Sequence, residues 1–151
     1  MGHFLSDKKV GEIGEKIAQQ ILGADFQKAP PKTAGYDFRA SSNGKTIEVK
    51  FDKMSEETNN LAFEVSNGTK LTGVFASEAD EIWYIAPLNG KYKIFRFNRE
   101  KLIKWLKSST SVRSVNGGDK KKFSLILAKI TDVEKYIDIL GEMQLWVEPQ
   151  E

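Results

Sequence analysis

The sequence predicts one α/β domain built on a mixed β-sheet flanked by helices. Its 151 residues suit a single domain and can bury a sizeable core. Segments with strand patterns interleave with segments of helical periodicity. Some neighbouring strand segments are joined by tight hairpins and others by longer crossovers, which favours a mixed sheet over a purely antiparallel one.

The composition removes several kinds of chemistry. The chain has no cysteine, which excludes disulfides, thiolate zinc sites, iron–sulfur clusters and a cysteine nucleophile. Its only histidine, His3, lies near the start of the chain, which argues against a histidine base or a histidine-ligated metal. A catalyst built from this composition must therefore use carboxylates, lysine and hard metal ions.

The first predicted element is a helix over residues 8–22. Val10, Ile13, Ile17 and Ile21 fall on one stripe of such a helix, and a glycine follows as a stop.

The remaining elements are expected in the following order. The first are strands over 35–40 and 46–51 joined at Asn43-Gly44, a polar loop over 52–60 and a strand over 61–66. A short helical turn capped by Ser77 follows, and then strands over 82–86 and 92–97 around Asn89-Gly90 and a basic helix from Asn98 to Lys107. The last are an exposed loop over 114–122, a strand over 123–129, and a helix that opens at 131–134 and ends at Gly141.

Charge is distributed unevenly along the chain. Residues 91–122 hold eleven bases and two acids, a net charge of +9, whereas the rest holds twelve bases and nineteen acids, a net charge of −7. Such a division favours binding of a polyanion to the basic part; a solvated lysine surface is the alternative. The candidate contacts to such a polyanion are Lys91, Lys93, Arg96, Arg99, Lys104, Lys107, Arg113, Lys120, Lys121 and Lys122.

The first hairpin places four charged residues together. A loop of two residues or of four residues gives the same side-chain parity, so Asp37, Arg39, Glu48 and Lys50 share one face in either register. Asp37 and Glu48 then lie opposite or diagonal to each other, about 5–8 Å apart.

Two adjacent carboxylates require a cation. Arg39 and Lys50 can neutralise them, as on an ordinary exposed hairpin. Alternatively, Asp37, Glu48 and the main-chain carbonyl of Val49 offer oxygen ligands for Mg²⁺, with Mn²⁺ as a substitute. Lys50 then orients water or neutralises charge on a phosphate.

This arrangement, Gly35-Tyr36-Asp37-Phe38 followed by Thr46-Ile47-Glu48-Val49-Lys50, resembles the PD-(D/E)XK nuclease superfamily. The resemblance covers residues 8 to about 86 and includes the order helix, three strands, helix and strand. Tyr36 departs from it, because proline usually precedes the aspartate. The resemblance implies a restriction-endonuclease-like fold, Mg²⁺-dependent cleavage that leaves a 5′-phosphate, and catalytic roles for Asp37, Glu48 and Lys50.

The superfamily resemblance also implies an acidic ligand on the first helix. Glu12 and Glu15 are the candidates, and we prefer Glu15 because a helical wheel places it nearer the buried stripe. A looser similarity to phage and Holliday-junction-resolvase-like members implies that Thr58, Asn59 or Glu64 borders the active site.

Together these observations predict a Mg²⁺-dependent DNA endonuclease. Its substrate is branched DNA, a specific duplex site, as for restriction or homing enzymes, or a nicked or single-stranded end. Cutting both strands requires a homodimer or a larger homo-oligomer. We expect no membrane association and a cytoplasmic location, with a phage or mobile-element origin as one option. The alternative is a non-catalytic nucleic-acid-binding or assembly protein on the same fold.

Overall fold

The computed structural model describes residues 7–31, 35–67, 70–88, 91–108, 112–117, 123–135 and 143–147. Three sequence predictions fall outside these ranges, namely the turn at Asn89-Gly90, the helix end at Gly141 and the positions of Lys120, Lys121 and Lys122. No helix in the described ranges is both long and apolar enough to cross a membrane.

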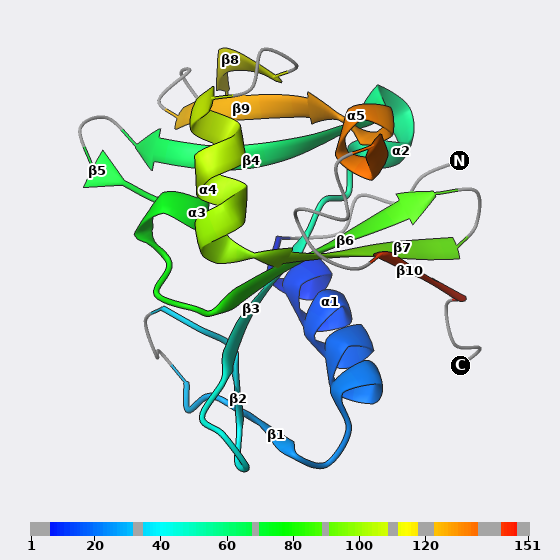
Figure 1. Cartoon of the computed structure of the whole chain (residues 1–151). Coiled ribbons are helices and arrows are strands. Elements are labelled where there is room, and N and C mark those ends of the chain that lie inside the picture. The colour runs from blue at the N-terminus through cyan, green and yellow to red at the C-terminus, as the bar shows by residue number, and fades with distance from the viewer. Residues whose placement is uncertain are drawn as a thin grey trace.

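The strands form two sheets (Figure 1). The first sheet has six strands in the order β1-β2-β3-β6-β7-β10. All neighbouring strands are antiparallel except β3 and β6, which are parallel, so the expected mixed sheet is present. Its strands are β1 (Phe26–Lys28), β2 (Phe38–Ala40), β3 (Thr46–Phe51), β6 (Glu81–Leu88), β7 (Lys91–Asn98) and β10 (Met143–Val147).

The second sheet is fully antiparallel, with the order β5-β4-β9-β8. Its strands are β4 (Asn60–Asn67), β5 (Lys70–Leu71), β8 (Val112–Gly117) and β9 (Phe123–Lys129). The helices are α1 (Asp7–Leu22), α2 (Ser55–Thr58), α3 (Gly73–Ala76), α4 (Arg99–Ser108) and α5 (Ile130–Lys135).

Helix α1 packs on one face of the first sheet, and the second sheet lies with α4 on the other side (Figure 1). The apolar stripe of α1 joins a core cluster that includes Ile17, Ile47 and Trp83. Gly14 allows the helix to approach the sheet closely, since a Cβ there would lie 3.3 Å from Cβ of Phe51. The helix therefore sits directly against β3.

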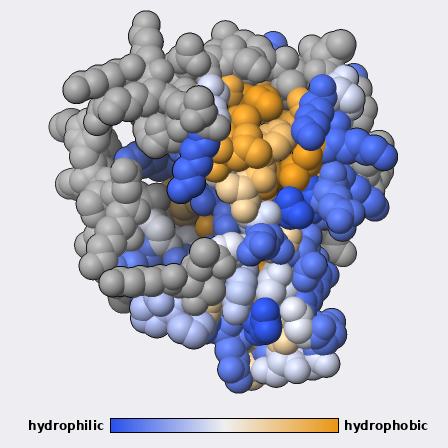
Figure 2. Space-filling view, turned by 90° about the vertical axis from the view of Figure 1, so that its left-hand side faces the viewer, coloured by the Kyte–Doolittle hydropathy of each residue, from blue (hydrophilic) through white to orange (hydrophobic). Residues whose placement is uncertain are grey.

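A second core cluster joins the opposite face of the first sheet to the second sheet. Phe97 and Tyr84 of the first sheet pack with Phe63 of β4 and with Leu102 of α4. On the face shown in Figure 2, an apolar patch in the upper half is bordered by hydrophilic side chains.

Several predicted elements need correction. The strand predicted over 61–66 exists as β4 but pairs with β9 in the second sheet. The third strand beside β2 and β3 is the three-residue β1, which is too short to show periodicity in the sequence. Residues 114–117, expected in a loop, belong to β8.

The helix ends follow the capping prediction in one place and not in another. Asn98 caps α4 as expected, because its Oδ1 accepts the N–H of Lys101 at 3.1 Å. Ser77 ends α3 instead of opening a helix, and its N–H donates to the Gly73 carbonyl. Its hydroxyl donates to the Gly35 carbonyl at 3.2 Å, so this serine joins two loops.

A polar network holds the start of β6. The carboxylate of Glu81 is 13% exposed, accepts the indole N–H of Trp83 at 2.8 Å and pairs with Lys45 and Arg96. Burial alone raises the pKa of Glu81, but the hydrogen bonds from Lys45 and Trp83 and the charge of Arg96 outweigh it and hold the pKa below its usual value.

We expect Glu81→Gln to lower the free energy of unfolding by about 1.5–3 kcal/mol at pH 7, because charged hydrogen bonds are lost. A lowered native pKa gives stability above the unfolded value of 4.5, and this stability is lost as the pH falls through the native value. Urea unfolding should therefore show a smaller difference at about pH 3. Exposed Glu57→Gln is the control, and an equal loss at both pH values would contradict the assignment.

Candidate functional site

The hairpin between β2 and β3 has the longer of the two expected loops, with four residues. Phe38 pairs with Ile47 and Arg39 with Thr46, which corresponds to a four-residue loop. Gly44 closes this loop at φ +74°, a left-handed conformation that glycine adopts without strain. The register extends to place Asp37 opposite Glu48.

Asp37 lies one residue before β2, where the strand pairing ends. Its N–H donates to the Ile47 carbonyl at 2.8 Å, and its own carbonyl accepts the N–H of Ala29 at 2.7 Å. Its carboxylate Oδ2 accepts the N–H of Val49 at 2.7 Å. The Asp37 side chain thus replaces a backbone acceptor and extends the hydrogen bonding along β3 past the end of β2.

This hydrogen bond also bears on the main-chain carbonyl of Val49. In an antiparallel pair, the N–H and the C=O of one residue point towards the same neighbouring strand. The Val49 carbonyl therefore points to the same edge of β3 as the Asp37 carboxylate, as the predicted ligand set requires.

Glu48 and Lys50 alternate with the buried residues of β3. Their neighbours Ile47, Val49 and Phe51 belong to the cluster that packs under α1, so Glu48 and Lys50 point to the opposite face. The ammonium of Lys50 lies 3.2 Å from Oε2 of Glu48. One of the two expected cations therefore does neutralise an acid of the site.

Charged side chains of α1 and β3 affect the pKa of Asp37. Burial is the main cause that raises the pKa of Asp37, the hydrogen bond from Val49 opposes it, and the negative charges of Glu15 and Glu48 raise the pKa further. The positive charge of Lys50 lowers it. The three other side chains predicted as catalytic therefore lie near enough to Asp37 for their charges to act on it.

Lys28 is a member of the site that the sequence analysis missed. Its ammonium pairs with Oε1 of Glu15 at 2.9 Å. The hydrogen bond and charge of Glu15 raise the pKa of Lys28, and Glu12 and Asp37 contribute less. Because Glu15 makes the direct contact, the structure places Glu15 nearer to the site than Glu12. Only β1, which the sequence did not reveal, brings Lys28 to this position.

The donor set suits a hard divalent ion in kind, since it consists of carboxylates and a main-chain carbonyl. Within the described ranges, however, no group of three or more His, Cys, Asp or Glu side chains is arranged to hold an ion. Glu48 and Glu15 are each paired with a lysine. Lys50 and Lys28 therefore compete with an ion for these carboxylates.

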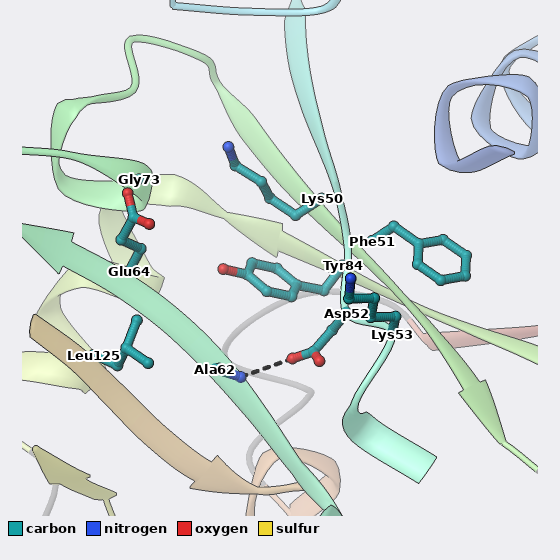
Figure 3. Close-up of a pocket in the computed structure, with 9 residues that line it drawn as sticks. All are labelled: Lys50, Phe51, Asp52, Lys53, Ala62, Glu64, Gly73, Tyr84 and Leu125. Atoms are coloured by element: carbon teal, nitrogen blue, oxygen red, sulfur yellow. Dashed lines mark hydrogen bonds between the residues drawn. The ribbon is translucent and has the colours of Figure 1, made fainter. Parts of the chain in front are cut away.

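A pocket of about 270 Å³ opens beside Lys50, between the two sheets (Figure 3). The ammonium of Lys50, the hydroxyl of Tyr84 and the carboxylate of Glu64 turn into the same space. Asp52 also lines this pocket, but its Oδ2 accepts the N–H of Ala62 at 2.8 Å. Glu64, one of three residues implied to border the active site, therefore lies next to Lys50.

Thr58 and Asn59 do not line this pocket. The Thr58 hydroxyl donates to the carbonyl of Met54, four residues earlier, at 3.0 Å. Asn59 ends the same helix in a left-handed conformation, with φ 61°, and its carbonyl accepts the N–H of Ile130. The structure thus gives both residues a local role at the end of α2.

Arg39 does not pair with either acid of the hairpin. Its guanidinium lies 5.0 Å from the centre of the Tyr36 ring, and within the described part of the chain it forms no ion pair. Both residues line a second pocket, of about 380 Å³, together with Lys28. Arg39 and Lys28 therefore line a cavity separate from the one beside Lys50.

Some of the candidate DNA-binding residues already contact other groups of the protein, and others are exposed. Lys93 pairs with Glu134 at 2.8 Å, Arg96 pairs with Glu81, and Arg99 donates to the Ala79 carbonyl at 3.0 Å. Lys91, Lys104 and Lys107 are exposed. Only the backbone of Arg113 is described.

No protein-family model, curated protein or solved structure matches the chain. The function is therefore argued from the site alone.

We expect Asp37→Asn to retain the fold, because an amide oxygen can still accept the Val49 N–H. Since the pKa of Asp37 is raised in the native state, the wild type loses stability relative to the variant as the pH rises from about 3 to 7. Thermal unfolding in EDTA across that range measures this change. A variant that is less stable by the same amount at every pH would contradict it.

Proposed function

We propose that this protein is a divalent-cation-dependent DNA endonuclease. The observation that carries the proposal is the position of the Asp37 carboxylate, which is held on the Val49 N–H and is in electrostatic contact with Glu15, Glu48 and Lys50. Two carboxylates, a third from a helix and one amine in a partly buried site are suited to hydrolysis of a phosphodiester.

The chain order of the first sheet supports the resemblance to the PD-(D/E)XK superfamily. Helix α1 is followed by three antiparallel neighbours, β1, β2 and β3, and then by β6, which runs parallel to β3. Within the first sheet this order is compatible with the helix, three-strand, helix and strand order that the resemblance implies, if α3 is taken as the second helix; α2, β4 and β5 also lie between β3 and β6 in the chain. The second sheet and α4 are additions to that core.

Each residue has a proposed task. Asp37, Glu48 and the Val49 carbonyl would hold the ion, with Glu15 as a further acidic ligand. A bound Mg²⁺ lowers the pKa of water and neutralises phosphate charge. Lys50, once separated from Glu48, is placed to hold a phosphate oxygen or the attacking water. Lys28 and Arg39 extend the positive surface towards the neighbouring phosphates.

One observation favours the non-catalytic alternative. The ion pairs Lys50–Glu48 and Lys28–Glu15 neutralise two of the three carboxylates of the site without any metal, as in a purely structural hairpin. A protein that only binds nucleic acid or assembles on it would need nothing more. Added Mg²⁺ distinguishes the two functions, because it would lead to cleavage of DNA only if the protein is a nuclease.

The decisive assay uses supercoiled plasmid and a labelled four-way junction, with Mg²⁺ and with EDTA. We expect metal-dependent cleavage that falls by at least about 100-fold in Asp37→Ala and Lys50→Ala, because each removes a group that acts in the transition state. Exposed Lys16→Ala is the control for lysine removal, and it should cleave as the wild type does. Tight binding to intact DNA in the presence of Mg²⁺ would support the alternative instead.

Removing Lys104 and Lys107 together should weaken DNA binding across sequences. Each lysine that contacts a phosphate contributes about 0.7–0.9 to the slope of log Kd against log salt, so the double alanine variant should lower that slope by about 1.5. Fluorescence anisotropy at several salt concentrations, in Ca²⁺, measures it. The triple variant of Lys120, Lys121 and Lys122 tests the remaining basic segment, and an unchanged slope in both variants would remove these lysines from the interface.

A further inference from the structure

The hairpin side of the proposed catalytic site has a cavity to which the proposed hydrolysis assigns no ligand. Its volume is about 380 Å³, and β1, β2 and the loops next to them form it. These two strands lie at the opposite end of the molecule from the second sheet (Figure 1). The volume falls within the range of about 300–1,000 Å³ that is usual for small-ligand sites.

The charge of this cavity is unlike that of the pocket beside Lys50. Among the described residues that line it are two cations, Lys28 and Arg39, and no acid. The lining of the pocket beside Lys50 instead includes two lysines and two acids. The ammonium of Lys28 pairs with Glu15 at 2.9 Å, so its charge is already balanced. A ligand would therefore meet the charge of Arg39, which favours an anion.

The guanidinium of Arg39 is held by an aromatic ring instead of an acid. It lies 5.0 Å from the centre of the Tyr36 ring, within the range of a cation–π contact. Alternation along the hairpin puts Arg39 on the same face as Asp37 and Glu48, yet both acids have other partners, a backbone N–H and a lysine. Because Arg39 is exposed and a ring face accepts none of its in-plane hydrogen bonds, its N–H donors remain available to a ligand.

A second donor lies beside Arg39. Gln27 of β1 is its direct partner in the antiparallel register, so the two side chains are on the same face of the sheet. Gln27 is exposed, and its side-chain amide makes no hydrogen bond with any other described residue. A guanidinium and an amide side by side suit a phosphate group, which accepts hydrogen bonds on several oxygens at once.

The spacing along β2 relates this cavity to the proposed catalytic site. Arg39 follows Asp37 by two residues on extended chain, which corresponds to about 6.6 Å. Successive phosphates along a nucleic-acid strand are separated by a similar distance. A strand whose scissile phosphate lies at Asp37 and Glu48 would thus bring its next phosphate to Arg39.

We propose that Arg39, held on the Tyr36 ring and assisted by Gln27, binds the phosphate next to the one that is cut. The inference rests on the proposed DNA substrate. It adds that the enzyme requires a charged nucleotide beyond the scissile phosphate on one side, which favours cleavage within a strand over removal of a terminal nucleotide on that side. Arg39 is a positioning residue in this assignment, because it holds the strand and does not touch the reacting atoms.

Binding of the labelled four-way junction in EDTA tests the contact without any cleavage. We expect Arg39→Ala to weaken binding about tenfold, the effect of one charged hydrogen-bonded contact. The slope of log Kd against log salt should fall by about 0.9, the contribution of one phosphate. Lys70→Ala, which removes an exposed cation of β5, is the control for net charge and should leave the slope unchanged. If both variants lower affinity and slope equally, Arg39 contributes only net charge and the proposal fails.

Two variants of Tyr36 test how the guanidinium is held, with thermal unfolding as the check on folding. Tyr36→Phe keeps the ring and should lose less than about twofold in affinity for the junction, whereas Tyr36→Leu should lose about threefold, the equivalent of one cation–π contact. When Arg39→Ala is already present, Tyr36→Leu should have no further effect. A folded Tyr36→Leu variant that binds as the wild type does, or that loses as much without Arg39 as with it, would contradict the proposal.

Cleavage of modified junctions locates the phosphate. After the cut is mapped, one uncharged methylphosphonate replaces the phosphate on either side of it in two otherwise identical junctions. We expect the wild type to cleave one of the two about tenfold more slowly, and Arg39→Ala to cleave that junction as fast as the unmodified one, because the contact is already absent.

The two kinds of failure can be told apart. A lower salt slope in Arg39→Ala without any cleavage would count against the nuclease and leave the phosphate contact in place. Cleavage in which the losses from Arg39→Ala and from either methylphosphonate add together would keep the nuclease and overturn the assignment of Arg39.

Discussion

The hydrogen bond from the Val49 N–H to the Asp37 carboxylate is the contact on which the site depends. It occurs where backbone pairing between β2 and β3 stops, so a side chain replaces a strand partner. The backbone of Asp37 is also held by Ile47 and Ala29, but this bond is the one that fixes its carboxylate relative to Glu48 on the neighbouring strand. The charges of Glu15 on α1 and of Lys50 on β3 also act on this carboxylate. The bond therefore fixes the group on which the charges of the helix and of the hairpin act.

Two of the three carboxylates of the site are already paired with lysines, and this bears on how the site could bind a ligand. Each lysine next to it, Lys28 and Lys50, is paired with one acid, while Asp37 is satisfied by a backbone N–H. Bringing an ion or a phosphate into such a site exchanges partners instead of creating charge, which limits the desolvation cost. The two lysines would then be released beside the substrate.

The part of the site that could be predicted came from local pattern. Alternation along β3 and the even length of the hairpin loop were enough to place Asp37, Glu48 and Lys50 on one face. What could not be predicted depends on contacts between distant segments. Lys28 reaches the site through a three-residue strand without periodicity, and Tyr84 reaches Lys50 through a parallel pairing. The second sheet was missed for the same reason, since the pattern of β4 identifies a strand but not its neighbour.

The parallel pair of β3 and β6 also bears on how the molecule assembles. Lys50 and Tyr84 are direct partners although the chain between them contributes β4 and β5 to the other sheet. Pairing them requires closure of a long loop, which costs chain entropy before the stabilising contacts have formed. The β2–β3 hairpin instead forms between segments that are close in the sequence. We therefore expect Asp37, Glu48 and Lys50 of the hairpin to come together early in folding and the pairing of Lys50 with Tyr84 to form late.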